Sequence, residues 1–228
     1  MKKVGFIGVY DKIDLILCIA KLLEQAQKKV LVIDATTLQK SKYVVPAINP
    51  VKSYITDYTG IDVAIGFESM EEIKRYLSIE DEIKIDYDYV FIDTDNYEGI
   101  VNFNIPSSNK IYYVTSFDAY SLKKGIEVLE QLRTPLKMTR IFFSKEMLKE
   151  EVEYFDYLSL GVKADWSEEK IFFLLENGDG AAIAENQRIS KIKLRNLSNE
   201  YRENVIFLTN DIEKGIDEMK LRKYMKNL

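Results

Sequence analysis

Short apolar runs alternate with amphipathic segments along the whole chain. Residues 4–9 and 30–33 are apolar runs, and the segment between them, residues 13–26, places isoleucine and leucine at helical spacing. A continuous apolar run that ends in a polar residue, here Asp34, is typical of a strand buried on both faces of a parallel sheet. The beginning of the chain therefore predicts a strand, a helix and a second, parallel strand.

The same alternation recurs downstream. It predicts helices over residues 70–77, 122–132 and 145–155, and strands over residues 89–92, 111–115, 138–143 and 171–175. Strands that alternate with helices indicate an α/β fold with a single doubly wound, mostly parallel sheet flanked by helices.

Segment 35–66 lacks this periodicity, and we expect a long loop there with a short helix near residues 51–58. No internal repeat and no stretch of linker composition marks a domain boundary. We therefore expect one domain over residues 1–228, with an amphipathic helix within residues 213–228.

The amino-acid composition limits which kinds of binding site and catalytic site the chain can form. The 46% hydrophobic fraction of the 228 residues is ample for a full core, and a net charge of -5 makes direct DNA binding unlikely on electrostatic grounds. Cys18 is the single cysteine and histidine is absent, which excludes internal disulfides, Cys/His zinc sites and triads that use histidine. No run of about 18 apolar residues occurs that would span a bilayer, so we expect a cytoplasmic protein.

Three local patterns resemble the ParA/MinD branch of the P-loop NTPases, over most of the chain. Residues 28–35 are similar to the second strand of that family, although Thr36 replaces its last Asp. Residues 87–94 resemble the Walker B strand, whose final Asp serves magnesium and the attacking water, and Asp93 holds that place. Residues 113–122 resemble the next strand and the start of its helix. The C-terminal stretches 185–188 and 197–201 resemble the TadZ or CpaE group of pilus-assembly proteins within the family.

The loop between the first strand and the first helix departs from the family's Lys-Gly-Gly-x-Gly-Lys-Thr. Residues 8–14 read Gly-Val-Tyr-Asp-Lys-Ile-Asp, so only one glycine remains and Ile13 follows the lysine where the family has a magnesium-binding hydroxyl. A phosphate cradle needs residues that tolerate a positive φ, and Val and Tyr are poor choices. Asp11 and Asp14 would each repel a phosphate about 4 Å away by about 4 kcal/mol, and either could cap the helix instead.

Each candidate site residue has two interpretations. Asp34 and Asp93 end neighbouring predicted strands, where ligands of open α/β sheets bind, and they would be catalytic in an active ATPase; alternatively they cap turns or helices. Gly8 and Lys12 would be the remnant of a nucleotide-binding loop, with Lys12 a phosphate ligand, whereas a solvated surface lysine is the alternative. If magnesium bound, Asp93 and Asp14 would hold it.

Two further segments are open to two interpretations. Residues 178–180, Gly-Asp-Gly, predict a tight turn before a short helix over residues 181–184; the resemblance implies a loop facing adenine at this place. Residues 221–228 predict a basic amphipathic helix, which packs against the domain or, as the resemblance implies, touches a membrane.

These observations favour a scaffold or positioning protein that keeps the ParA/MinD fold, binds no cofactor and acts by association. The resemblance implies partners of two kinds: another copy or a related ATPase, and a cytoplasmic component of a pilus, secretion or conjugation apparatus. The alternative is a weak or atypical ATPase that binds Mg-ATP. In that case Lys12 would meet the phosphates, and Asp93 with Asp14 or Asp34 would hold the magnesium.

Overall fold

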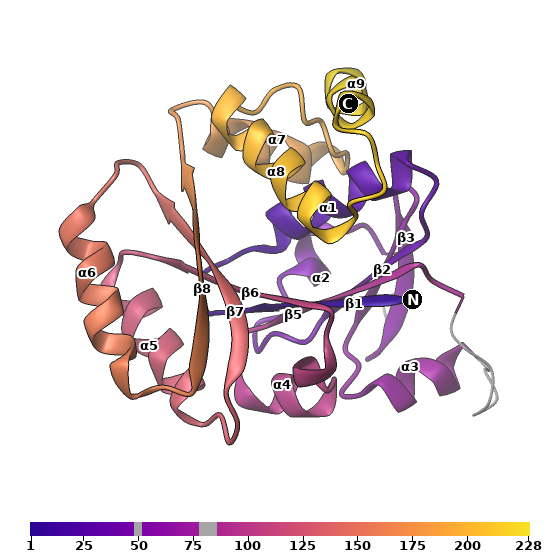
Figure 1. Cartoon of the computed structure of the whole chain (residues 1–228). Coiled ribbons are helices and arrows are strands. Elements are labelled where there is room, and N and C mark those ends of the chain that lie inside the picture. The colour runs from indigo at the N-terminus through magenta and orange to yellow at the C-terminus, as the bar shows by residue number, and fades with distance from the viewer. Residues whose placement is uncertain (48–51, 78–85) are drawn as a thin grey trace.

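The computed structural model describes residues 1–47, 52–77 and 86–228, in which one sheet carries helices on both faces (Figure 1). Its strands are β1 (Lys2–Ile7), β2 (Val30–Asp34), β3 (Tyr54–Tyr58), β4 (Ile61–Ile65), β5 (Tyr89–Thr94), β6 (Lys110–Ser116), β7 (Leu136–Ser144) and β8 (Ala164–Leu174). Their order in space is β3-β4-β2-β5-β1-β6-β7-β8, and every neighbouring pair is parallel except β3 with β4. The predicted α/β class with a doubly wound, mostly parallel sheet is confirmed.

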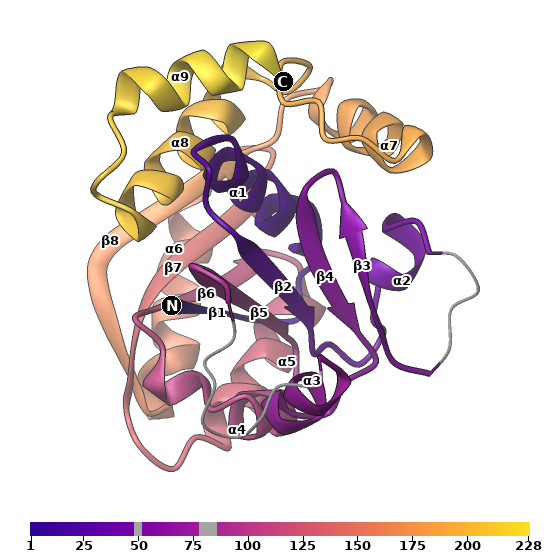
Figure 2. The same cartoon turned by 90° about the vertical axis from the view of Figure 1, so that its right-hand side faces the viewer.

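Two layers of helices cover the sheet, one on each face (Figures 1 and 2). The first layer consists of α1 (Ile13–Gln25), α2 (Ser41–Val44), α7 (Asp179–Ile189), α8 (Asn199–Ile212) and α9 (Glu218–Asn227). The second layer consists of α3 (Met70–Tyr76), α4 (Tyr97–Asn102), α5 (Ala119–Glu130) and α6 (Lys149–Leu158), with short 3₁₀ turns at Ile105–Ser107 and Ser159–Gly161. Each layer buries its own hydrophobic cluster against the sheet.

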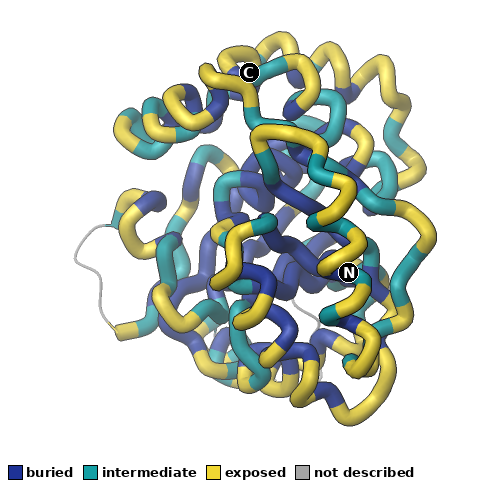
Figure 3. Tube along the Cα trace, turned by 90° about the vertical axis from the view of Figure 1, so that its left-hand side faces the viewer, coloured by how far each residue is buried: buried dark blue, intermediate teal, exposed yellow. Residues whose placement is uncertain are grey.

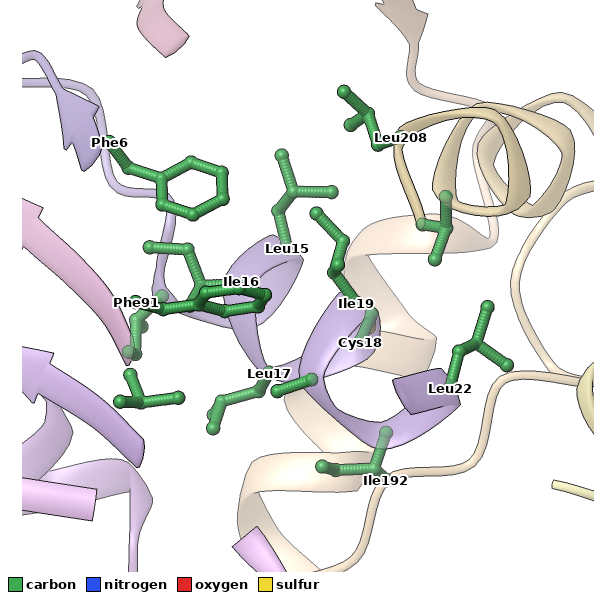
Figure 4. Close-up of a cluster of buried hydrophobic side chains, with 14 of the residues drawn as sticks. Phe6, Leu15, Ile16, Leu17, Cys18, Ile19, Leu22, Phe91, Ile192 and Leu208 are labelled. Carbon is green, nitrogen blue, oxygen red and sulfur yellow. The ribbon is translucent and has the colours of Figure 1, made fainter. Parts of the chain in front are cut away.

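The helix α1 is apolar on nearly all sides because it is enclosed on nearly all sides. Figure 4 shows its side chains between Phe6 and Phe91 of the sheet and Leu208 of α8 with Ile192. A helix with this pattern must be covered on both its inner and outer surfaces. The layer therefore has two tiers here, with α8 and α9 packed over α1.

The strand β1 lies between β5 and β6 in the middle of the sheet. These central strands are buried over nearly their whole length, and Figure 3 shows the interior of the trace as buried while exposed positions gather on its outside. From β1 the chain crosses through α1 to β2 on one side, and β6 continues the sheet on the other. Loops at the carboxyl end of such a central strand are the usual place for ligands in open α/β sheets.

The expectation of a long loop over residues 35–66 was wrong. That segment contains α2 and a hairpin of β3 and β4, and the helix expected near residues 51–58 is the strand β3, with residue 51 outside the described residues. The hairpin turns at Thr59 and Gly60, whose φ angles are +57° and +88°. Two consecutive positive φ angles suit a two-residue hairpin turn, so Thr-Gly between two short apolar runs was the missed signal.

Several predicted boundaries also shift. The helix expected at residues 145–155 is α6, which begins at Lys149, and the strand expected at residues 171–175 is the longer β8. The first half of β8 carries charged residues because it lies at the edge of the sheet, so it lacks the apolar run of a central strand. The helix expected at residues 181–184 is α7, and α8 was not predicted.

The C-terminal helix α9 uses its apolar side within the fold. Leu221 and Met225 are buried, at 0% and 3% exposed, and Tyr224 and Leu228 pack partly against the same cluster. Insertion of this apolar side into a membrane would therefore require it to detach first. Over the described ranges, the helices lack the combined length and apolar character needed to cross a lipid bilayer.

Candidate functional site

Gly8 sets the course of the loop that joins β1 to α1. Its φ angle is +139°, a conformation that residues with a Cβ rarely adopt. A Cβ at this position would lie 2.0 Å from the backbone oxygen of Val114 in β6. The Gly8 N–H donates to the backbone oxygen of Thr94 in β5 at 3.0 Å. The loop therefore lies tightly against both strands that flank β1, and only glycine fits at its start.

Lys12 ends this loop, and its side chain turns into the protein. The residue is 3% exposed, its Nζ donates to the backbone oxygen of Gly8 at 2.6 Å, and the same Nζ lies 2.6 Å from Oδ1 of Asp93. The interpretation of Lys12 as a solvated surface lysine is therefore wrong. A buried ammonium needs a partner, and the end of β5 supplies one directly beneath the loop.

Burial dominates the ionisation of Asp93. It raises the pKa of the carboxyl to about 7; the Lys12 ammonium opposes this change and the charge of Asp34 adds to it. The sheet register pairs Asp34 with Asp93, so the two carboxylates end adjacent strands. The sequence had placed both at this edge of the sheet, and the structure gives them different partners.

Asp34 organises the chain that follows β2. Its Oδ1 accepts from the N–H and the hydroxyl of Thr36 at 3.0 and 2.6 Å, and its Oδ2 accepts from the N–H of Ser41 at 2.9 Å. This carboxylate, 1% exposed as a residue, thus holds the turn after β2 and the start of α2. These contacts match a turn-capping role.

A second set of charges surrounds the start of α1. Lys40 forms an ion pair with Asp11 and lies 3.7 Å from Oδ2 of Asp14. Asp11 also accepts from the N–H of Ile13 at 3.3 Å, which is a capping contact at the first turn. Asp14 faces α7, where Nε2 of Gln187 lies 3.0 and 2.9 Å from its two oxygens. Burial raises the pKa of the Asp14 carboxyl, against the effects of Gln187 and Lys40.

A pocket of about 340 Å³ opens at the carboxyl ends of β1, β2 and β5. Its lining consists of Gly8, Val9, Tyr10, Asp11, Lys12, Ile13, Asp34, Thr36, Leu38, Lys40, Tyr43, Asp93 and Asp95. Four of these residues are aspartates and two are lysines, and both lysines already contact aspartates of the same pocket. The pocket therefore offers an incoming anion few positive charges that are not already neutralised.

The two carboxylates expected to hold magnesium have separate partners. Asp93 pairs with Lys12, whereas Asp14 contacts Gln187 and Lys40 and does not line the pocket. Within residues 1–47, 52–77 and 86–228, no group of three or more acidic or cysteine side chains is arranged to hold a metal ion. Ile13 adds no oxygen ligand next to Lys12, so the residues present do not fit a Mg-ATP site of the P-loop kind.

The Gly-Asp-Gly segment has a structural role away from the pocket. Asp179 is 0% exposed, and its carboxylate accepts from the N–H of Glu176 at 2.9 Å and from the N–H and hydroxyl of Ser198 at 2.6 and 2.8 Å. It thus ties the start of α7 to the start of α8. None of the residues 178–180 lines the pocket, which leaves the expectation of an adenine-facing loop without support here.

Sequence reasoning missed several residues of this region. Lys40, Leu38 and Tyr43 lie in the segment without periodicity, and their approach to the first loop depends on the turn after β2; Asp95 directly follows β5. Gln187 comes from α7, 173 positions along the chain from Asp14. No local sequence pattern predicts partners that lie so far apart along the chain.

Comparisons with known proteins bear on the fold. No family profile and no curated protein sequence matches the chain. Among solved structures, it is similar to a protein of Borrelia burgdorferi B31 assigned to plasmid partition and bound to AMPPNP (TM-score 0.59, 16% identity, covering 92% of this chain and 99% of that one). It is also similar to MinD of Pyrococcus horikoshii OT3 with Mg-ADP (0.58, 14%, 93% and 96%) and to the MinC:MinD complex of Aquifex aeolicus (0.55, 15%, 95% and 98%). The chain has the fold of the ParA/MinD P-loop NTPases.

Proposed function

We propose that this chain is a scaffold or positioning protein of the ParA/MinD fold that acts by protein association and does not hydrolyse ATP. The observation that carries the proposal is the state of Lys12. Its ammonium lies 2.6 Å from both the backbone oxygen of Gly8 and Oδ1 of Asp93. To reach a phosphate, this group would have to leave a buried ion pair, which is costly because the carboxylate remains behind without its partner.

The backbone of the loop supports the same conclusion. In residues 8–12 only Gly8 has a positive φ angle. A loop that wraps phosphates needs several consecutive N–H groups turned inward, which requires alternating or glycine-specific backbone angles. The side chains of Val9 and Tyr10 also occupy the pocket lining. We regard this loop as a degenerate form of the nucleotide loop.

Electrostatics in the pocket act against a polyphosphate. Two like charges about 4 Å apart repel by about 4 kcal/mol at an effective dielectric near 20, and the lining carries four aspartates against two lysines. Lys40 is engaged by Asp11 and Lys12 by Asp93, so neither ammonium is available without a rearrangement. Each lysine of the pocket is already paired with an aspartate, so neither is free to bind the phosphates of a nucleotide.

The pocket rim supports an association role. Leu38 and Tyr43 line the pocket yet remain 82% and 81% exposed. Large apolar side chains with such exposure are common in protein interfaces. The similar Aquifex aeolicus MinD was solved in complex with MinC, a protein partner. We assign this face to a related ATPase of the same fold.

The cellular setting of this proposal rests on sequence resemblance. The stretches 185–188 and 197–201 resemble the TadZ or CpaE group, which favours a cytoplasmic role with a pilus, secretion or conjugation apparatus. The proposed protein thus has a pocket whose lysines are already paired and a rim that binds a partner.

A weak or atypical ATPase is the second candidate, because Lys12 and Asp93 both line the pocket and two of the similar structures hold AMPPNP or Mg-ADP. Phosphate release from ATP separates the two candidates. With purified protein and magnesium, we expect the wild-type rate to equal that of the Lys12→Ala variant. Turnover by the wild type that Lys12→Ala abolishes would establish the enzyme and reject the scaffold.

A further inference from the structure

The outer side of α6, with the 3₁₀ turn Ser159–Gly161 that follows it, carries a stripe that the described part of the chain leaves uncovered. Tyr154, Tyr157 and Leu160 are 41%, 69% and 80% exposed. Glu150 and Glu153 are exposed at helical spacing from the tyrosines, and neither forms an ion pair with any described residue. We call these five residues the acidic stripe.

The outer side of α9 carries charges of the opposite sign. Lys220, Lys223 and Lys226 are exposed on the side away from the buried Leu221, and Met219 beside them is 78% exposed. Within the described residues these lysines have no ion-pair partner. We call these lysines and Met219 the basic stripe.

The two stripes complement each other but cannot meet within one chain. Figure 1 shows α6 and α9 at opposite ends of the molecule, each on the outside of its own helical layer. Both helices measure 10 residues, so the stripes have similar lengths of about 15 Å. We infer that α6 of one copy binds α9 of a second copy, so that copies of this chain associate head to tail.

The contact combines charge with apolar burial. Unpaired carboxylates on one helix would meet unpaired ammonium groups on the other, while Tyr157 and Leu160 would pack against Met219 and the lysine stems. Exposed ion pairs contribute little singly, so the association is weak and sensitive to salt. Because the contact joins two different surfaces, every dimer keeps one free α6 and one free α9, and further copies can add.

This association is independent of the pocket. Neither α6 nor α9 supplies a residue to the pocket lining. Substitutions in the two stripes therefore test the head-to-tail contact and leave the pocket unchanged.

Sedimentation velocity of the full chain over a range of concentrations tests the inference. At about 0.05 M salt we expect the average mass to rise with concentration above the 26.5 kDa of one copy, and at about 1 M salt to return to it. The basic stripe is reversed by Lys220→Glu with Lys223→Glu, and the acidic stripe by Glu150→Lys with Glu153→Lys. Each reversal alone should keep the chain monomeric at low salt.

The combined variant, with both stripes reversed, should associate again, because its charges are complementary once more. The pair Lys123→Glu with Lys137→Glu is the matched control, since both lysines are exposed elsewhere and the change in net charge is the same as for the basic stripe. It should associate like the wild type. A wild type that stays monomeric at low salt would overturn the inference, as would association that survives either reversal or fails to return in the combined variant.

Discussion

The ammonium of Lys12 and the carboxylate of Asp93 lie 2.6 Å apart, with side chains that are only 2% and 4% exposed. This pair joins the loop after β1 to the end of β5 in the interior of the pocket wall. A buried pair loses about 3–5 kcal/mol when one partner is removed, mainly because the other charge stays buried alone.

The first prediction concerns this coupling. Above the raised pKa of about 7, where Asp93 is ionised, Lys12→Met should lower the free energy of unfolding by about 3 kcal/mol, and Asp93→Asn added to it should recover most of that loss. Urea unfolding of the four proteins measures the coupling. Additive losses would show that the two side chains do not stabilise each other.

The second prediction concerns pH. Burial raises the pKa of Asp93 to about 7 in the folded chain, whereas the unfolded chain releases this proton near pH 4, at about the ordinary value for aspartate. Between these values the folded state binds a proton that the unfolded state does not, so rising pH lowers the stability.

The change is isolated by comparison with Asp93→Asn, which cannot titrate at this position. The stability of the wild type relative to this variant should fall as the pH rises from 4 through 7 and then level off. A difference that is constant over this range, or that rises with pH, contradicts the raised pKa.

The third prediction concerns Gly125 on α5 and Tyr113 on β6. A Cβ at position 125 would lie 2.1 Å from the Tyr113 hydroxyl oxygen, and this hydroxyl has no hydrogen-bond partner among the described residues. Gly125→Ala should cost about 1–3 kcal/mol, whereas Tyr113→Phe should be neutral or stabilising because it removes a buried, unpaired hydroxyl.

Thermal and urea unfolding should show that Tyr113→Phe recovers most of the loss in the double variant. Gly180→Ala is the matched control, since no atom lies within 4 Å of a Cβ at that helical position. It should not destabilise the protein. Failure of Tyr113→Phe to rescue Gly125→Ala would show that the hydroxyl is not the group in the way.

The fourth prediction concerns acid stability. Glu213 accepts from the ammonium of Lys2 at 2.7 Å and from the hydroxyl of Tyr89, and these contacts lower its pKa from 4.5 to about 2. The stabilisation is present above the ordinary pKa and is lost as the pH falls toward 2. Glu213→Gln should cost about 1 kcal/mol at pH 7 and flatten the loss of stability between pH 4.5 and 2.

Acid unfolding followed by circular dichroism measures this slope. Glu146→Gln changes an exposed glutamate in a loop and should leave the acid slope as it is. An equal slope for Glu213→Gln and the wild type would exclude a role for the contact with Lys2 and Tyr89.

The sequence predicted the fold class because the central strands are continuous apolar runs, as at residues 30–33 and 89–92. It missed the β3–β4 hairpin, where partial exposure breaks the apolar pattern and the Thr59-Gly60 turn carries the signal. It also missed α8, although the buried residues of this helix recur at helical spacing from Tyr201 through Val205 and Leu208 to Ile212; the polar Thr209 among them interrupts the apolar pattern.

The candidate site was predictable in part. Asp34 and Asp93 were placed at one edge of the sheet by the strands that precede them, and the register agrees. The inward turn of Lys12 was not predictable, since it depends on Gly8 bending the loop against Val114 and on Asp93 lying beneath it. Nor did any local signal connect Asp14 to Gln187 across 173 positions.

On the proposed function, both lysines of the pocket are already paired with its aspartates, and the pocket does not take up Mg-ATP. Isothermal titration of the wild type with Mg-ATP tests it most directly, beside a variant whose loop is returned to the glycine-rich form by V9G, Y10V, D11G, I13T and D14T. We expect no saturable binding of Mg-ATP by the wild type up to millimolar concentration. This expectation holds whether or not the variant with the restored loop binds Mg-ATP. Saturable binding by the wild type in the micromolar range, lost in Lys12→Ala, would contradict the account.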